Sequence, residues 1–338
     1  MRKVRRPPRG RREETKLIGV LCLCAATIAA LSASGEAQGP GRWVTKAPLP
    51  VGRTEVSVAE LDGKIYLLGG YVLGSVTSNL NQVYDPATDT WRDLRPMPIG
   101  LNHVGVIGYQ GKIYLFGGFI RQNRDPIAHA FAYDPRADKW QEIAPLPSKR
   151  GAVAVVALDG KLHVIGGAIG GERGVGFEGR RSVTLHEVYD PATDTWSQRA
   201  SLPERRDHLG LVVYDGKIHA IGGRLENFFN NTGRHDVYDP KTDRWSPRAP
   251  LPTPRSGFVA AVLDGYIVVI GGEGEKGVYD ENEAYDPKTD RWFSLARMPT
   301  PRHGTGAAVI GNVMYVPGGG PVRGGERRSD VHEAFTLR

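Results

Sequence analysis

A ten-residue pattern that occurs six times along the chain restricts the fold more than any other feature. The copies are LDGKIYLLGG (61–70), YQGKIYLFGG (109–118), LDGKLHVIGG (158–167), YDGKIHAIGG (214–223), LDGYIVVIGG (263–272) and IGNVMYVPGG (310–319). Their glycine pairs begin at residues 69, 117, 166, 222, 271 and 318, so successive copies lie 47 to 56 residues apart. A period of this length indicates a repeat fold rather than several unrelated domains.

A second motif has the same period. In five repeats a Tyr lies seven residues before a Trp, as in VYDPATDTW (83–91), and a Pro-rich segment follows the Trp. Each repeat therefore predicts four strands. The first ends in an Asp-Gly hairpin turn, the second ends at the glycine pair, the third carries the Tyr, and the fourth follows an Asp-Pro turn. We predict an all-β propeller of six blades.

The two ends of the repeat region complement each other. Phe335 stands where the sixth copy should have its Tyr, and no Trp follows it, whereas Trp43 near the start has no Tyr before it. The strand around Trp43 should therefore complete the sixth blade, so that residues 41–338 form one closed ring. Such a closure removes an exposed sheet edge.

The glycine pairs and the Tyr-x6-Trp pairs resemble those of the kelch-repeat family over about residues 42–338. The resemblance implies that the glycines let neighbouring blades approach and that the Tyr and Trp rings pack between blades. Both expectations agree with the physics of close backbone approach and aromatic burial. The resemblance also favours a non-enzymatic module, expected to be a monomer, that binds a protein or a glycan with one loop face.

Residues 1–37 are expected to be an export signal. Eight Lys and Arg residues and two Glu residues lie in positions 1–16, so six of the seven net positive charges are there. The uncharged apolar run 17–33 and the small residues after it complete the layout of a secretory signal, although an uncleaved membrane anchor stays open. In either case we expect a periplasmic or extracellular protein. Because the rest of the chain is almost neutral, no nucleic-acid partner is expected.

Arginines precede the first strand of five repeats and are the first candidate site residues. They are Arg53, Arg150, Arg206, Arg255 and Arg302, and Leu101 takes the equivalent place in the second repeat. As a ring near the channel mouth they could bind a carboxylate or another anion. Alternatively, their regular occurrence indicates a repeated structural brace.

Polar residues beside these arginines vary from blade to blade and are also candidates for ligand binding. They are Glu55, His103, His208 and His303. Three histidines near one rim suggest a metal, but they belong to blades two, four and six. We expect this separation to prevent joint ligation, so neither a metal nor another cofactor is predicted.

The loops after the glycine pairs differ in length and composition. The fourth repeat offers Phe228 and Phe229 beside asparagines, a combination suited to a sugar or a peptide. In the fifth, Glu273 follows the glycines directly. Its setting is similar to that of the acid/base glutamate in bacterial sialic-acid mutarotases, which are exported kelch propellers. A carbohydrate isomerase, with Glu273 as acid/base and rim arginines for the substrate carboxylate, is therefore the alternative function.

Overall fold

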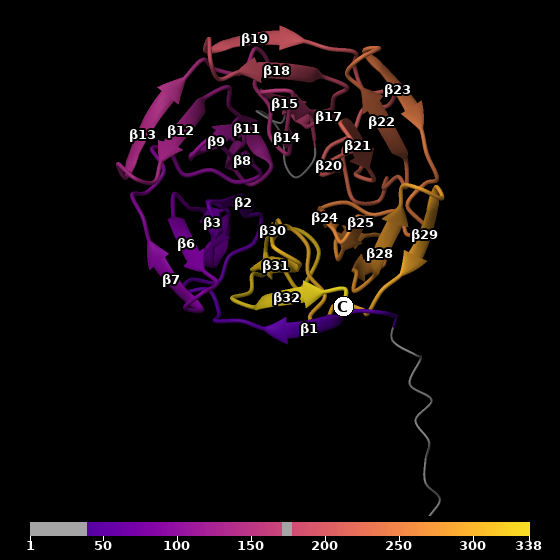
Figure 1. The fold of residues 1–338 in the computed structure, drawn as a ribbon. Coiled ribbons are helices and arrows are strands. Elements are labelled where there is room, and N and C mark those ends of the chain that lie inside the picture. The colour runs from indigo at the N-terminus through magenta and orange to yellow at the C-terminus, as the bar shows by residue number, and fades with distance from the viewer. Residues whose placement is uncertain (1–38, 171–177) are drawn as a thin grey trace, which may run out of the picture. The chain divides into compact units, whose positions relative to one another are not determined.

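The computed structural model describes residues 39–170 and 178–338, which form a ring of six four-stranded antiparallel sheets (Figure 1). The predicted six-bladed all-β propeller is thus confirmed. The export segment expected at 1–37 lies outside the described residues. Within the described part of the chain, no helix is both long and apolar enough to cross a membrane.

In blades one to five the strands follow chain order from the axis outward (Figure 1). Blade one contains β2 (Ser57–Leu61), β3 (Lys64–Leu68), β6 (Asn81–Asp85) and β7 (Thr90–Asp93). Blade two contains β8 (Gly105–Tyr109), β9 (Lys112–Phe116), β12 (Ala130–Asp134) and β13 (Lys139–Ile143). Blade three contains β14 (Ala154–Leu158), β15 (Lys161–Ile165), β18 (His186–Asp190) and β19 (Thr195–Gln198).

The second half of the ring follows the same plan. Blade four contains β20 (Gly210–Tyr214), β21 (Lys217–Ile221), β22 (His235–Asp239) and β23 (Arg244–Pro247). Blade five contains β24 (Val259–Leu263), β25 (Tyr266–Ile270), β28 (Asn282–Asp286) and β29 (Arg291–Ser294). Blade six contains β30 (Ala308–Ile310), β31 (Val313–Pro317), β32 (His332–Thr336) and, as its outer strand, β1 (Arg42–Thr45).

The strand β1 closes the ring as predicted. It pairs antiparallel with β32 and places Trp43 opposite Phe335. Their ring centroids are 5.1 Å apart, a separation close to that of the Tyr84–Trp91 pair in blade one. In Figure 1, the indigo β1 lies beside the yellow β32.

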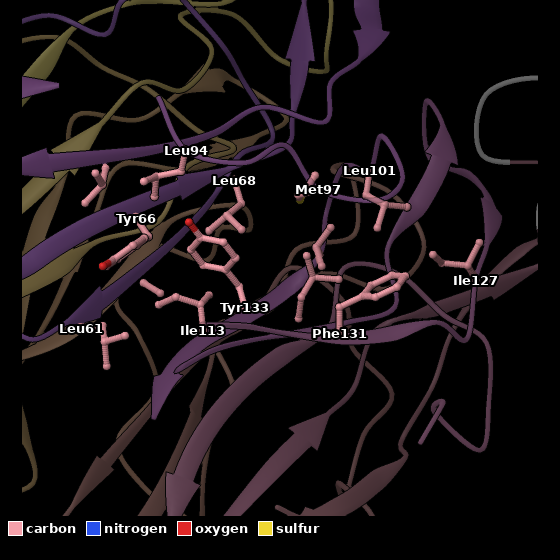
Figure 2. Close-up of a cluster of buried hydrophobic side chains, with 14 residues drawn as sticks. Leu61, Tyr66, Leu68, Leu94, Met97, Leu101, Ile113, Ile127, Phe131 and Tyr133 are labelled. Atoms are coloured by element: carbon pink, nitrogen blue, oxygen red, sulfur yellow. The ribbon is translucent and has the colours of Figure 1, made fainter. Parts of the chain in front are cut away.

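Apolar clusters lie between neighbouring blades because the two middle strands of each sheet are buried on both faces. The cluster between blades one and two joins Leu61, Leu68 and Leu94 to Ile113 and Tyr133 (Figure 2). The outermost strands are largely exposed. Core formation is therefore distributed around the ring, as expected for a repeat fold in which each unit packs on its neighbours.

The glycine pairs allow this close packing. A Cβ added to Gly117 would lie 2.2 Å from the carbonyl oxygen of Arg150 in the next blade, and one added to Gly69 would lie 2.2 Å from that of Leu101. Both glycines also have positive φ, a conformation that side chains disfavour. The role that the kelch resemblance implies for the glycines is confirmed.

The Tyr, Asp and Trp of the second motif connect each blade to the preceding one. In blade one the Tyr84 hydroxyl donates to Asp89, whose carboxylate also accepts from the Ala47 backbone N–H. The Trp91 indole N–H donates to the Ala47 carbonyl. The same contacts recur in blades two to five, for example through Tyr189, Asp194 and Trp196 in blade three. The Asp thus links two blades besides closing its turn.

Loops of two kinds share one face of the propeller, named here the loop face. One kind follows each glycine pair, and the other leads into the first strand of each blade. Short hairpins follow four of the glycine pairs: β4 (Tyr71–Val72) with β5 (Val76–Thr77), β10 (Phe119–Arg121) with β11 (Arg124–Pro126), β16 (Ala168–Gly170) with β17 (Arg180–Ser182), and β26 (Glu273–Gly274) with β27 (Gly277–Val278). A 3-10 turn, η1 (Leu73–Ser75), joins β4 to β5. In all six blades the residue after the glycines bridges to the residue after the arginine position.

Candidate functional site

The five repeated arginines are buried within their blades, with exposures of 1% or less. Arg302, for example, donates to the Gly318 carbonyl and, over 2.6 Å, to Glu333 on β32. Burial lowers the pKa of Arg53 to about 10, although Asp93 opposes the shift. Buried guanidinium groups that donate to carbonyls and side chains of their own blade support the interpretation of these arginines as a repeated structural brace. Arg53, Arg206, Arg255 and Arg302, candidates for ligand binding in the sequence, present no accessible guanidinium in this structure.

Blade two shows why Leu101 breaks the pattern. The brace acceptors in the other blades are Gln82, Glu187, Asp236, Glu283 and Glu333. The equivalent position in blade two is Phe131, and Leu101 and Phe131 belong to one apolar cluster (Figure 2). An apolar pair thus replaces a buried polar pair, a substitution that cores tolerate when both partners change. The joint change of both positions was visible in the sequence.

Six equivalent residues form a ring around the axis, named here the axial ring: Glu55, His103, Ala152, His208, Gly257 and Gly304. Each adopts a left-handed conformation, with φ between 53° and 62°. Backbone hydrogen bonds connect them from blade to blade, as from the Ala152 N–H to the His103 carbonyl, and the Val56 N–H closes the circle on Gly304. This small ring lets side chains of non-adjacent blades meet.

The expectation that the histidines are too far apart is therefore wrong for two of them. The ring centroids of His103 and His208 are 4.8 Å apart, although blade three lies between their blades. Glu55 joins them, with its Oε2 atom 3.1 Å from His103 Nε2. His303, one position before the axial ring, contacts the other Glu55 oxygen at 3.3 Å. Four of the predicted site residues thus form one cluster.

Charged groups surround this cluster and pair with one another. Arg224 contacts Glu273 at 2.6 Å and Asp207 at 3.1 Å, and Arg180 contacts Asp207 at 2.8 Å. The Gly324 N–H donates to the second oxygen of Glu273 over 2.9 Å. Asp207 follows a repeated arginine, Arg180 lies in the variable loop of the third repeat, and Arg224 directly follows a glycine pair. The sequence thus identifies all three as variable positions, but not their mutual contacts.

Burial and charge set the protonation of this network. Burial alone lowers the pKa of His303, but the carboxylates of Glu273 and Glu55 raise it to about 9. Burial alone raises the pKa of Glu273, but His303 and Arg224 hold it below its ordinary value. Burial and the nearby Arg224 lower the pKa of His208 to about 3. At neutral pH the network therefore combines ionised carboxylates, a charged His303 and a neutral His208.

A pocket of about 420 Å³ lies on the loop face and adjoins this network through Gly324. Its charged lining residues are Arg121, Arg124, Arg323 and Glu326, and its aromatic one is Phe228. Phe228 and Phe229 contact each other, and the Arg323 guanidinium lies over both rings at 5.2 and 5.8 Å. Phe229 stays 60% exposed. The structure thus brings the predicted aromatic pair beside arginines of other blades.

Comparison with known proteins supports the fold and the family. The family model of the Attractin/LZTR1 β-propeller matches residues 65–331. Shorter segments are 44% identical over 55 residues to Kelch-like protein terF of Aspergillus terreus and 49% identical over 37 residues to human Kelch-like protein 35. These segments cover 15% and 11% of this chain and only 12% and 6% of the two relatives.

A solved structure has the same architecture. The chain described as "Structure of YjhT" superposes with a TM-score of 0.72 at 18% identity, over 84% of this chain and 95% of that one. Identity this low shows a shared fold and no more. Together with the six glycine pairs and the closed ring, the family match leads to one conclusion. The chain belongs to the kelch-repeat propellers and, within them, to the Attractin/LZTR1 β-propeller family.

Proposed function

We propose that this protein is an interaction module whose loop face binds an acidic, partly apolar segment of a protein partner. Exposed apolar side chains carry the proposal. Of the eight large hydrophobic residues that are exposed in the described part of the chain, five lie in loops that follow glycine pairs: Leu73, Val76, Ile120, Phe229 and Val322. Concentration of such residues on one face is typical of protein-binding surfaces.

The charges of the pocket indicate the sign of the partner. Three arginines and one glutamate line it, and one of the arginines, Arg121, already pairs with Asp125. Arginine guanidinium groups bind carboxylates through paired hydrogen bonds. Arginine and aromatic residues are also enriched in the energetically dominant parts of protein interfaces. A segment with Glu or Asp beside an apolar residue would satisfy both features. With the export predicted for residues 1–37, such a partner would lie outside the cytoplasm.

The carbohydrate-isomerase alternative depends on Glu273. The surroundings of Glu273 favour an isomerase less than they favour a protein-binding module. This side chain is 1% exposed, and its carboxylate already contacts Arg224, His303 and the Gly324 N–H. A sugar would have to displace these contacts before Glu273 could exchange a proton with it, because acid/base catalysis requires hydrogen-bond contact with the substrate. The rim arginines, which this alternative assigns to the substrate carboxylate, are buried.

Selection from a random displayed peptide library tests the proposal. Acidic peptides with an apolar residue should be enriched, and Arg323→Ala or Phe229→Ala should weaken their binding at least about tenfold. Phe293→Ala is the matched control, because Phe293 is an exposed aromatic on β29, outside the loop face.

Three results would contradict the proposal. Enrichment of peptides without acidic residues would contradict the inference that the partner segment is acidic. Equal losses in the Phe229 and Phe293 variants would place the site elsewhere. Acceleration of sialic-acid anomer exchange in NMR spectra, abolished by Glu273→Gln, would establish the enzyme instead.

A further inference from the structure

Three side chains of the axial ring present possible metal ligands to one another. A carboxylate oxygen of Glu55 and one nitrogen each of His103 and His208 lie within 4.8 Å of one another. Small residues at neighbouring positions of the ring make room for them. At Gly304, an added Cβ would lie only 2.7 Å from the Glu55 carboxylate.

Both histidines are oriented as metal ligands usually are. His103 Nδ1 lies 2.6 Å from Asn102 Oδ1, and His208 Nδ1 lies 2.5 Å from Asp207 Oδ1. The Asn102 amide nitrogen donates to the Phe119 carbonyl, which identifies Oδ1 as the acceptor facing His103. Each Nδ1 therefore faces an acceptor, and the Nε2 atoms are the nitrogens left to bind a metal. A hydrogen bond from Nδ1 to an acceptor is the usual outer contact of a metal-bound histidine.

The Nε2 atom of His103 has no hydrogen bond, although the residue is only 8% exposed. It faces Glu55 Oε2 at 3.1 Å. A lone pair directed at a carboxylate oxygen is unfavourable unless a proton or a cation lies between them. Two ligands at about 2.0–2.1 Å from one tetrahedral ion are separated by about 3.3 Å, so the observed spacing suits a shared metal.

We propose that Glu55, His103 and His208 bind a divalent transition-metal ion, such as Zn²⁺, on the propeller axis. Two imidazoles and one carboxylate are ligands that such ions prefer, and three protein ligands leave a position for water or another molecule. The inference is independent of the proposed function of the loop face.

Binding of the ion would change one hydrogen bond next to the site. Arg224 Nη2 now lies 3.0 Å from His208 Nε2, so metal binding replaces this hydrogen bond. Arg224 keeps its contacts with Asp207 and Glu273. Its charge and that of Arg180 are balanced by these two carboxylates, and the Glu55 carboxylate contacts His303. A central cavity of about 370 Å³ is lined by the inner strands, and its lining includes Leu209, the residue that follows His208.

Metal binding can be measured directly on the full chain. After removal of metal with a chelator, titration with Zn²⁺ or Co²⁺ should reach one equivalent per chain, and Co²⁺ should show d–d absorption bands of nitrogen and oxygen coordination. Glu55→Gln and His208→Gln should weaken binding at least about 100-fold, and Asn102→Ala, which removes only an outer contact, about 10- to 100-fold.

His129→Ala is the matched control. His129 and Glu142 form an exposed pair at 2.7 Å, so this variant measures adventitious binding by a surface histidine and carboxylate. It should retain the full equivalent. Circular dichroism without metal identifies a variant that fails to fold. The proposed metal site is then tested with the variants that do fold. Wild-type protein that binds no metal, or binding that survives both Glu55→Gln and His208→Gln, would overturn the proposal.

Discussion

Replacing one glycine of a pair tests whether steric contact between blades explains the repeat. Gly117 and Gly111 both lie in blade two and both have positive φ, 61° and 76°. An added Cβ at Gly117 would lie 2.2 Å from the Arg150 carbonyl oxygen, whereas one at Gly111 would meet nothing within 4 Å. Alanine at either position costs about 1–2 kcal/mol of unfolding free energy for the left-handed backbone.

Only Gly117→Ala adds a steric cost. The Arg150 carbonyl would have to move by about 1 Å and would weaken the hydrogen bond that it accepts from the Gly118 N–H at 3.0 Å. Loss of a buried hydrogen bond costs about 1–3 kcal/mol. At about 2.1 cal/mol/K per residue, a propeller of about 300 residues unfolds with an entropy of about 0.6 kcal/mol/K, so a difference of about 2 kcal/mol should place the melting temperature of Gly117→Ala about 3 °C below that of Gly111→Ala. Thermal unfolding followed by circular dichroism gives both values. Equal melting temperatures would refute the argument that close approach requires the glycine.

Two further predictions concern the buried polar groups. Arg302→Leu should cost about 3–5 kcal/mol in urea unfolding because it leaves Glu333 buried and unpaired, and the double variant with Glu333→Phe, copied from blade two, should recover most of the loss; no recovery would contradict the brace interpretation. Burial lowers the pKa of His235 to about 4, so its unfolded form takes up a proton first as pH falls below about 6.5, and stability decreases from there until the folded-state pKa is reached. At about pH 5 this should cost about 2 kcal/mol. His235→Asn copies the equivalent Asn282 and its hydrogen bond to a linker carbonyl but gives up the contact with His219 Nδ1, so its stability in acid is compared with its own value at neutral pH. It should lose less in acid than the wild type does; equal losses would exclude His235 as the cause.

Periodicity in the sequence determined the architecture. The glycine pairs, the Tyr-x6-Trp pairs and the unmatched Trp43 and Phe335 were sufficient to predict six blades and their closure. These features are local, because each repeat must bury the same faces against the same neighbours. The arginine braces were also within reach of the sequence, since the arginine recurs together with an acid or, at Gln82, an amide, and both positions become apolar in blade two.

Only the tertiary structure decided which variable residues meet. Glu55, His103 and His208 belong to blades one, two and four, and their distance in sequence order suggested separation. The closed backbone ring brings equivalent positions of all blades close to one axis, so side chains pass across an intervening Ala152 and come into contact. Repeat spacing shows which positions are equivalent. Their distance from the axis follows from ring closure, and it is short enough for side chains of non-adjacent blades to form the cluster.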